Sequence, residues 1–218
     1  MLNVLITGGN GYIGSMLIEK LILKMNYNIY TLNKNIIHGK KIKLISLKKK
    51  YKNIKFDNIF LLGFNNDLIL HETKIKNTIV SNYLYFDKLI KFINNHIKKN
   101  SKVIFTSSAS LLGNKYNYKN NDKKTELLSF YDLNKLFIEN YLEFNSNLNK
   151  NFNLTILRIT NVYGETNSKQ FQKNRGFINN VIKKMVNKDV TTIFGDGKYK
   201  RNYIHISDVI DALIIAMK

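Results

Sequence analysis

The sequence contains no cysteine, no proline and no tryptophan. Without cysteine, the chain can have neither a disulfide framework nor a thiolate nucleophile or metal ligand. The four histidines are scattered without the spacing of zinc ligands, so we expect no metal site. No apolar run reaches the roughly 18 residues of a membrane span, and the N-terminus lacks the features of a secretion signal. We therefore expect a cytoplasmic protein that does not enter a membrane.

Acidic residues are also few: 15 Asp and Glu stand against 35 Lys and Arg, which gives a formal net charge of +20. Such an excess is typical of nucleic-acid-binding proteins. However, only three of the basic residues are arginine, the side chain that most often reads bases by bidentate hydrogen bonds. The lysines are spread over the whole chain. The charge is better explained as a solvated lysine-rich surface, and we do not expect nucleic acid as a partner.

Strand-like and helix-like segments alternate along the chain. Short apolar runs rich in β-branched residues occupy residues 3–9, 28–33, 57–63, 102–108 and 154–160. Apolar residues at helical spacing occupy residues 14–25, 78–99 and a segment that begins at Ser129. This alternation predicts parallel βαβ units, and strands that are apolar throughout indicate a sheet covered on both faces. We expect an α/β fold, a doubly wound parallel sheet of the Rossmann type. The Lys- and Asn-rich stretch 40–55 carries no motif that we can interpret.

A glycine-rich turn joins the first expected strand to the first expected helix. Gly9, Gly11 and Gly14 form the pattern G-x-G-x-x-G in this strand-to-helix context. Glycine allows a tight turn, close approach of a pyrophosphate and close packing of the helix on the strand. The helix N-terminus adds free N–H groups and a partial positive charge. The loop predicts a dinucleotide site made by Gly8, Gly9, Gly11, Tyr12, Ile13 and Gly14.

The acidic residue expected about 20 positions further on, which would bind a ribose 2′-hydroxyl, is absent. Asn33 and Lys34 stand there instead. Asn33 could hydrogen-bond a ribose hydroxyl, and Lys34 could pair with a 2′-phosphate unless it is only one more surface lysine. The cofactor can therefore be NAD or NADP.

Tyr131 and Lys135 lie four residues apart on an expected helix and so share one face. In a chain rich in Tyr and Lys, this spacing alone does not separate a catalytic pair from an ordinary helix face. Its context is more informative, because the glycine loop precedes it and the strand ending in TSSAS places Ser108 23 residues before Tyr131. The simplest alternative for TSSAS is capping of the strand end by the hydroxyls of Ser107 and Ser110.

Two further segments, LRITNVYGE and FGDGKYKRNYIHISDV, complete a set of motifs in a fixed order. With them the sequence resembles the extended short-chain dehydrogenase/reductases, and among these the NAD-dependent epimerase/dehydratase family of nucleotide-sugar enzymes. The resemblance implies that Tyr131 takes a proton from a sugar hydroxyl while hydride leaves the same carbon for the cofactor. Ser108 would hold that oxygen. Lys135 would bind the nicotinamide ribose and, as a fixed ammonium, favour the phenolate.

The resemblance also assigns three residues outside this group. Asn82 falls at the family's helix asparagine, near the cofactor. Asn161 and Arg201 would contact the substrate, with Arg201 gripping a diphosphate. A surface salt bridge to Asp196 or Asp208 is the alternative for Arg201.

The sequence departs from the family pattern at several positions. Dehydratases carry an Asp-Glu pair where Ala109 and Ser110 stand, so epimerisation or reduction of a keto-sugar is favoured over dehydration. LLGF replaces H-L-A-A after the fourth strand, and Leu112 replaces a common Tyr.

Family members usually continue beyond the end of this chain. We therefore expect a cofactor-binding domain at 1–160 and, at 161–218, a partial substrate-binding region interleaved with it, which forms a small and incomplete lobe. The family also implies a homodimer formed through the helices at 78–99 and 129–144. The alternative function is that of a non-catalytic, cofactor-binding regulator or assembly protein, one that could use its basic surface on RNA.

Overall fold

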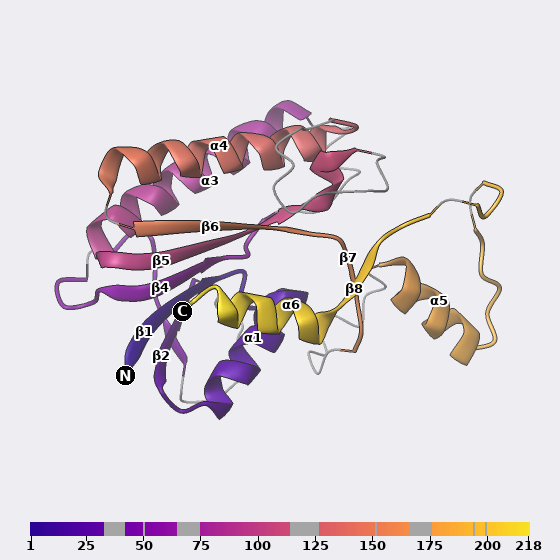
Figure 1. Ribbon diagram of the computed structural model, residues 1–218, viewed down its shortest axis with the longest axis horizontal. Helices are drawn as coiled ribbons and strands as arrows, with labels where there is room; N and C mark the ends of the chain where they lie inside the picture. The colour runs from indigo at the N-terminus through magenta and orange to yellow at the C-terminus, as the bar shows by residue number, and fades with distance from the viewer. Residues whose placement is uncertain are drawn as a thin grey trace.

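A computed structural model describes residues 1–32, 42–49, 51–64, 75–113, 127–150, 152–165, 176–193, 195–198 and 200–218. At its centre lies a six-stranded parallel sheet with helices on both faces (Figure 1). Its strands are β1 (Leu2–Thr7), β2 (Tyr27–Thr31), β3 (Ile42–Leu44), β4 (Phe56–Leu61), β5 (Ile97–Ser108) and β6 (Phe152–Ile159). The expected doubly wound α/β fold is confirmed.

The strand order is β3-β2-β1-β4-β5-β6, so the chain changes direction across the sheet between β1 and β4. In open parallel sheets, ligands bind beyond the carboxyl ends of the strands at this switch point. The glycine-rich loop follows β1 directly and therefore lies at that place.

Two layers of helices cover the sheet. Helices α3 (Ile75–His96) and α4 (Phe130–Asn149) lie on one face, and α1 (Tyr12–Leu23) and α6 (Ile206–Ile215) lie on the other (Figure 1). Each face has its own apolar cluster, with Phe86 and Ile138 on the first side and Ile18 and Leu213 on the second. Both faces of the central strands are thus buried, which explains why these strands are apolar throughout.

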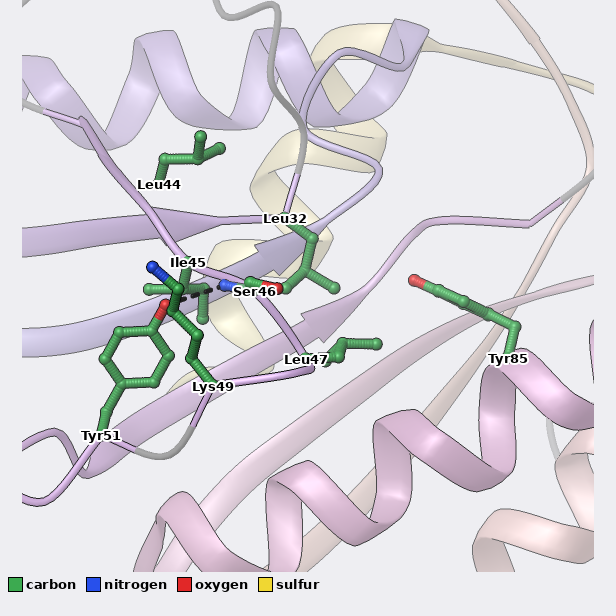
Figure 2. A pocket seen from close by; sticks show the side chains of 8 residues that line it. All are labelled: Leu32, Leu44, Ile45, Ser46, Leu47, Lys49, Tyr51 and Tyr85. Atoms are coloured by element: carbon green, nitrogen blue, oxygen red, sulfur yellow. Dashed lines mark hydrogen bonds between the residues drawn. The ribbon is translucent and has the colours of Figure 1, made fainter.

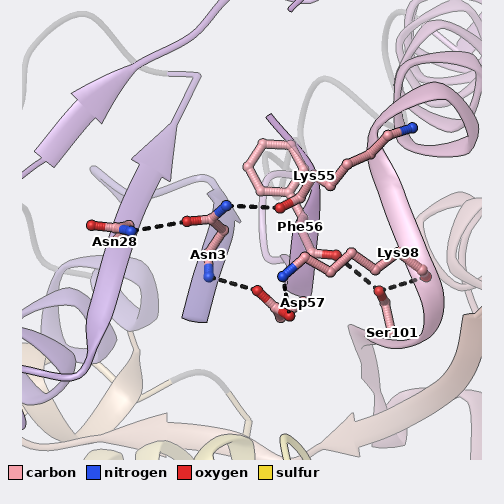
Figure 3. A network of polar contacts seen from close by, with 7 residues as sticks. All are labelled: Asn3, Asn28, Lys55, Phe56, Asp57, Lys98 and Ser101. Carbon is pink, nitrogen blue, oxygen red and sulfur yellow. Dashed lines mark hydrogen bonds and ion pairs between the residues drawn. The ribbon is translucent and has the colours of Figure 1, made fainter. Parts of the chain in front are cut away.

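The helix expected at 78–99 ends earlier, at His96, because the next residues join the sheet. Ile97 pairs with Phe56, and the Ser101 hydroxyl donates to the Phe56 carbonyl oxygen at 2.8 Å. The Lys98 ammonium lies 2.6 Å from Asp57 Oδ1 (Figure 3). Asp57 also accepts a hydrogen bond from the Asn3 N–H, so this network joins the amino-terminal ends of β1, β4 and β5. The short strand β3 lies inside the stretch 40–55 and was not predicted.

Beyond β6 the chain leaves the main sheet. Strands β7 (Asn161–Tyr163) and β8 (Tyr203–His205) form a separate parallel pair, and α5 (Phe177–Val186) projects away from the body (Figure 1). Helix α6 then returns and packs against α1. Within the described ranges, no helix combines the length and the apolar character needed to cross a membrane.

Candidate cofactor and catalytic site

The loop after β1 packs against the loop after β4. Gly8 has a φ of +68°, and a Cβ built on it would lie 2.7 Å from the Gly63 nitrogen. The Thr7 hydroxyl oxygen accepts hydrogen bonds from the N–H groups of Leu62 and Gly63, at 3.1 and 3.0 Å. A side chain at position 8 would therefore be strained and would push the two strand ends apart.

The glycine loop also determines how close α1 comes to β1. A Cβ on Gly14 would lie 2.2 Å from the Gly8 carbonyl oxygen, a distance that requires glycine. Gly11 caps α1 without a side chain, and the first turn of this fully described helix contains no acidic residue. The first N–H groups of the helix, including those of Tyr12 and Ile13, have no intrahelical acceptor. The start of α1 is thus a suitable cradle for a phosphate group.

A cavity of about 390 Å³ opens past the carboxyl ends of β2 and β3 (Figure 2). The Tyr51 hydroxyl accepts a hydrogen bond from the Ser46 N–H at 3.0 Å, which holds the loop after β3 in place. Tyr85 faces this loop from α3. The lining is mostly apolar and aromatic, which suits a flat ring. It consists of Leu32, Leu44, Ile45, Ser46, Leu47, Lys49, Tyr51 and Tyr85.

The structure brings Ser108, Tyr131 and Lys135 together. Ser108 ends β5, and its side chain hydrogen-bonds the Tyr131 phenol from the first turn of α4. The Lys135 Nζ lies 5.9 Å from the centre of the Tyr131 ring and donates to the Thr106 carbonyl oxygen at 2.9 Å. Lys135 is only 4% exposed. A hydroxyl, a phenol and a buried amine thus meet at the carboxyl end of β5.

Phe64 completes this group, and sequence reasoning did not identify it. The Lys135 Nζ lies 4.1 Å from the centre of the Phe64 ring, and the same ring meets Tyr131 edge to face at 5.7 Å. The only signal in the sequence was the departure of LLGF from the family pattern. A single aromatic side chain from the loop after β4 therefore contacts both members of the Tyr131–Lys135 pair.

Burial changes the acidity of both residues. The pKa of Tyr131 is raised to about 12, chiefly by burial; the hydrogen bond with Ser108 lowers it, and the Asp132 charge makes a smaller contribution that raises it. Burial lowers the pKa of Lys135 to about 7, and the nearby Glu139 charge partly opposes this. We expected the Lys135 ammonium to favour the phenolate. In the protein alone, desolvation dominates and favours the neutral phenol.

The capping expected from TSSAS involves a different serine. The Ser108 Oγ, rather than that of Ser107 or Ser110, caps the short 3₁₀ helix η1 (Ala109–Leu112) by accepting from the Ser110 N–H at 3.2 Å. The buried Ser107 hydroxyl has no hydrogen-bond partner among the described residues. Ser108 thus combines a capping contact with its contact to Tyr131.

Asn82 lies on α3 and is buried, and its Nδ2 has no hydrogen-bond partner within the described part of the chain. An amide that is buried without a partner costs free energy, which suggests that a ligand or water completes it. Asn33 and Lys34 lie outside the described residues.

Asn161 and Arg201 lie at the start of the β7–β8 pair, outside the main sheet. Asn161 comes two residues after Ile159, which pairs with Ser108. Both are exposed, and the Asn161 side chain donates to the Asn202 carbonyl oxygen at 3.1 Å. Arg201 forms no ion pair with any described residue, so the salt bridge to Asp196 or Asp208 is not observed there.

Tyr12 connects the glycine loop to the chain beyond β6. Its hydroxyl donates to the Gly164 carbonyl oxygen at 2.6 Å. The Asn179 side chain on α5 makes two hydrogen bonds to the Gly164 backbone, at 3.1 and 3.2 Å. The predicted cofactor loop and the segment expected to bind substrate are therefore directly linked, a contact that no sequence pattern predicted.

Comparison with known proteins matches residues 4–218 to the family described as the NAD dependent epimerase/dehydratase family. The chain is 29% identical to a putative UDP-glucose 4-epimerase of Methanocaldococcus jannaschii, over 98% of this chain and 73% of that protein. It is 27% identical to a UDP-glucose 4-epimerase of Mycoplasma pneumoniae, over 99% of this chain and 71% of that protein.

Among solved structures, the UDP-glucose 4-epimerase of Thermotoga maritima, determined with UDP-glucose, superimposes with a TM-score of 0.81. It is 24% identical, and the match covers all of this chain and 74% of that one. This likeness shows that the two proteins share a fold. The family match extends over nearly the whole chain and includes every motif identified above. The chain belongs to the NAD dependent epimerase/dehydratase family, and its cofactor is NAD or NADP.

Proposed function

We propose that the protein is an NAD(P)-dependent nucleotide-sugar epimerase or reductase that moves hydride to and from a sugar carbon through a keto intermediate. The observation that carries the proposal is the meeting of Ser108, Tyr131 and the buried Lys135 at the carboxyl end of β5. The same edge of the sheet carries the glycine loop. A cofactor cradle and a group able to move a proton therefore share one site.

The residues around this edge fit a dinucleotide. In the proposal, the start of α1 holds the pyrophosphate and the cavity beside Leu32, Tyr51 and Tyr85 takes the adenine ring. Lys135 reaches the nicotinamide ribose, and Asn82 offers the buried amide that lacks a described partner. The bound cofactor supplies the hydride acceptor and, in its oxidised form, a positive charge.

The roles of the chain's own residues follow from their acidity. Tyr131 takes the proton of a sugar hydroxyl as phenolate and returns it as phenol. With a pKa of about 12 it is protonated near neutral pH, so the cofactor's charge must favour the phenolate. Lys135, with a pKa of about 7, is close to half-protonated at that pH and contributes when it is charged. Ser108 holds the sugar oxygen beside Tyr131.

Asn161 and Arg201 are proposed to contact the nucleotide sugar. Arg201 is exposed and lies two residues before β8, which is a suitable position for gripping a diphosphate. The relatives named above are described as UDP-glucose 4-epimerases, so UDP-sugars are the first substrates to examine. Ala109 and Ser110 provide no carboxylate for dehydration, which favours epimerisation or reduction.

The proposal is tested by incubating the protein with NAD or NADP and a panel of UDP- and dTDP-sugars, followed by product analysis by NMR. A new epimer or a reduced sugar, absent when Tyr131 is replaced by Phe, would support the proposal. A cofactor-bound protein that converts no sugar of the panel would favour the second candidate.

That second candidate is a cofactor-binding protein without turnover. It is favoured by one observation: Asn161, Arg201 and the whole of α5 are poorly enclosed, and α5 contains no buried residue. The intact group of Ser108, Tyr131 and Lys135 argues against it.

A homodimer is also part of the proposal. The outer faces of α3 and α4 expose large apolar side chains, among them Val80, Leu84, Leu133 and Phe137, each more than 40% exposed. Such a patch is typical of an interaction surface. We expect sedimentation to show a dimer that Phe137→Asp converts to a monomer, while the exposed Phe177→Asp on α5 leaves it intact. A monomeric native protein would contradict this part of the proposal.

A further inference from the structure

A chain of hydroxyl groups joins Tyr131 to a buried carboxylate. The Ser108 and Ser110 Oγ atoms lie 2.7 Å apart, and the Ser110 hydroxyl donates a short hydrogen bond to Asp132 Oδ1. Ser108 in turn hydrogen-bonds the Tyr131 phenol. Asp132 is only 2% exposed, although it follows Tyr131 directly on α4.

Helix capping explains only one of the two Asp132 oxygens. Oδ2 accepts from the Ser129 hydroxyl at 2.9 Å and from the Leu128 N–H at 3.2 Å. The Asp132 N–H donates back to Ser129 Oγ, which completes the cap of α4. Oδ1 has no part in this cap. Its contact with Ser110 therefore needs a separate explanation.

The number of hydroxyl protons available determines which group donates and which accepts in each of these hydrogen bonds. An ionised carboxylate only accepts, and a serine hydroxyl has a single proton to donate. Because Ser110 gives its proton to Asp132, Ser108 must be the donor in the 2.7 Å contact with Ser110. While Tyr131 is a neutral phenol, Ser108 then has only lone pairs to offer it, so Ser108 accepts the phenol proton. This direction favours the neutral phenol, the form that protonates the oxygen of a keto-sugar. The hydrogen bond with Ser108 lowers the pKa of Tyr131 only when Ser108 turns and donates to the phenolate.

We propose that Ser110 and Asp132 are positioning residues that set the direction of the hydrogen bond between Ser108 and Tyr131. This inference rests on the proposed roles of Ser108 and Tyr131. When Tyr131 takes a proton from a substrate hydroxyl, the hydrogen bonds between the two serines and Tyr131 must first reverse direction. Ser110 then donates to Ser108, and Ser108 donates to the phenolate. Asp132 then keeps the two hydrogen bonds of the helix cap and loses only that from Ser110.

Few other charges act on Tyr131 among the described residues. Asp132 and Lys135 face it from its own helix, Ser108 faces it from β5, and the uncharged Phe64 ring faces it from the loop after β4. Removing Ser110 therefore changes the hydrogen bonding of Ser108 without removing a charge. Removing the Asp132 charge changes both the chain and the electrostatic effect.

The test is the ionisation of Tyr131, followed by NMR of protein labelled at tyrosine Cζ and assigned with Tyr131→Phe. In Ser110→Ala, Ser108 is free to donate to the phenolate, and the pKa of Tyr131 should fall by about one unit, the size of one hydrogen bond to a charged group. The fraction of Tyr131 present as phenolate near pH 10, read from the Cζ chemical shift, should then rise roughly tenfold. Asp132→Asn should move it further in the same direction.

Two variants make the result specific. Ser110→Thr keeps a hydroxyl and should restore the native titration. Ser129→Ala removes the helix cap alone and should lower thermal stability without moving the Tyr131 titration. An unchanged titration in Ser110→Ala, or an equal change in Ser129→Ala, would overturn the inference. Because the protein is titrated without cofactor, this failure is distinct from that of the proposed function, which would appear as a lack of turnover.

Discussion

The proposed site has a cofactor half, formed by the glycine loop and the group around Lys135, and a substrate half, formed by Asn161 and Arg201. The two halves differ in how firmly the protein holds their residues in place. Lys135 is 4% exposed and contacts the Phe64 and Phe105 rings, and the glycine loop is fixed by backbone contacts between two strand ends. Asn161 and Arg201 are exposed and lie on a two-stranded pair outside the main sheet. The cofactor half is therefore organised by the core of the protein itself, whereas the substrate half is not.

Helix α5 shows the same contrast. It is amphipathic, yet Phe177, Ile182, Met185 and Val186 remain more than half exposed. Helix α6, of equal length, buries five residues against the sheet and α1. We conclude that substitutions away from the Tyr12–Gly164 contact should change cofactor binding and substrate binding separately.

The largest effect is expected for Tyr131→Phe. Removing the phenol hydroxyl removes the proposed proton acceptor, so turnover should fall by roughly 10²–10⁴ while NAD(P)H affinity stays unchanged. Product formation and cofactor fluorescence would be measured on the same samples. Tyr141→Phe is the control and should retain turnover, because Tyr141 lies on the same helix but its hydroxyl donates a hydrogen bond to Asp87. Equal turnover in both variants would remove Tyr131 from the mechanism.

The next effect concerns the charge of Lys135. Its folded pKa of about 7 lies below the ordinary value of 10.5, so the unfolded state binds more protons between these values. The free energy of unfolding of the native protein should therefore rise with pH across this window. Between pH 7 and roughly pH 9.5 it should rise by about 3 kcal/mol more than that of Lys135→Met, which lacks the amine.

Urea unfolding of both proteins across that range measures the difference. Lys91→Met is the control, because Lys91 lies on the surface of α3 and its charge stays in water. If the Lys135→Met protein follows the pH dependence of the native protein, the ammonium is not buried as described.

A smaller effect is expected at the glycine loop. In Gly14→Ala the new Cβ would meet the Gly8 carbonyl oxygen, and we expect a loss of about 2 kcal/mol in unfolding free energy as α1 shifts. Cofactor affinity should fall with it, because the phosphate cradle moves. Ser15→Ala, one residue along the same helix, should have a milder effect. Native affinity in Gly14→Ala would place the pyrophosphate elsewhere.

The smallest effect is expected in the substrate half. Arg201→Ala removes one charge-assisted hydrogen bond to a diphosphate, so KM for the nucleotide sugar should rise about tenfold or more. Cofactor affinity should not change. Lys198→Ala is a matched control, because Lys198 is also exposed and, among the described residues, forms an ion pair with Asp196 alone. A change in cofactor affinity with Arg201→Ala would show that the two halves are not separate.

Sequence alone predicted the features that depend on local patterns. The parallel sheet followed from alternating segments, and the glycine loop followed from glycine spacing just after a strand. Ser108, Tyr131 and Lys135 were placed by the order of motifs, and the structure brings them together. The sheet and the glycine loop are signalled by short stretches, whereas the Ser108, Tyr131 and Lys135 group needed the order of several motifs along the chain.

The features that were missed depend on contacts between distant residues. Strand β3 pairs with β2 although its own stretch is rich in lysine, and Ile97 leaves the helical pattern because Phe56 is available for pairing. Phe64 reaches Lys135 from another loop, and Asp132 reaches Ser110 across 22 positions. The pKa of Tyr131 was expected to fall through the Lys135 charge, but burial raises it instead and also lowers the pKa of Lys135.

The most direct test of the central claim is calorimetric titration of the native protein with NAD, NADP and their reduced forms, repeated in the presence of UDP- and dTDP-sugars. We predict micromolar cofactor binding without any sugar, because the cofactor half is organised by the core, and tighter binding once a nucleotide sugar is present. The choice between NAD and NADP would also reveal the roles of Asn33 and Lys34. Absence of dinucleotide binding would contradict the account and reduce the Tyr131–Lys135 pair to an ordinary helix face.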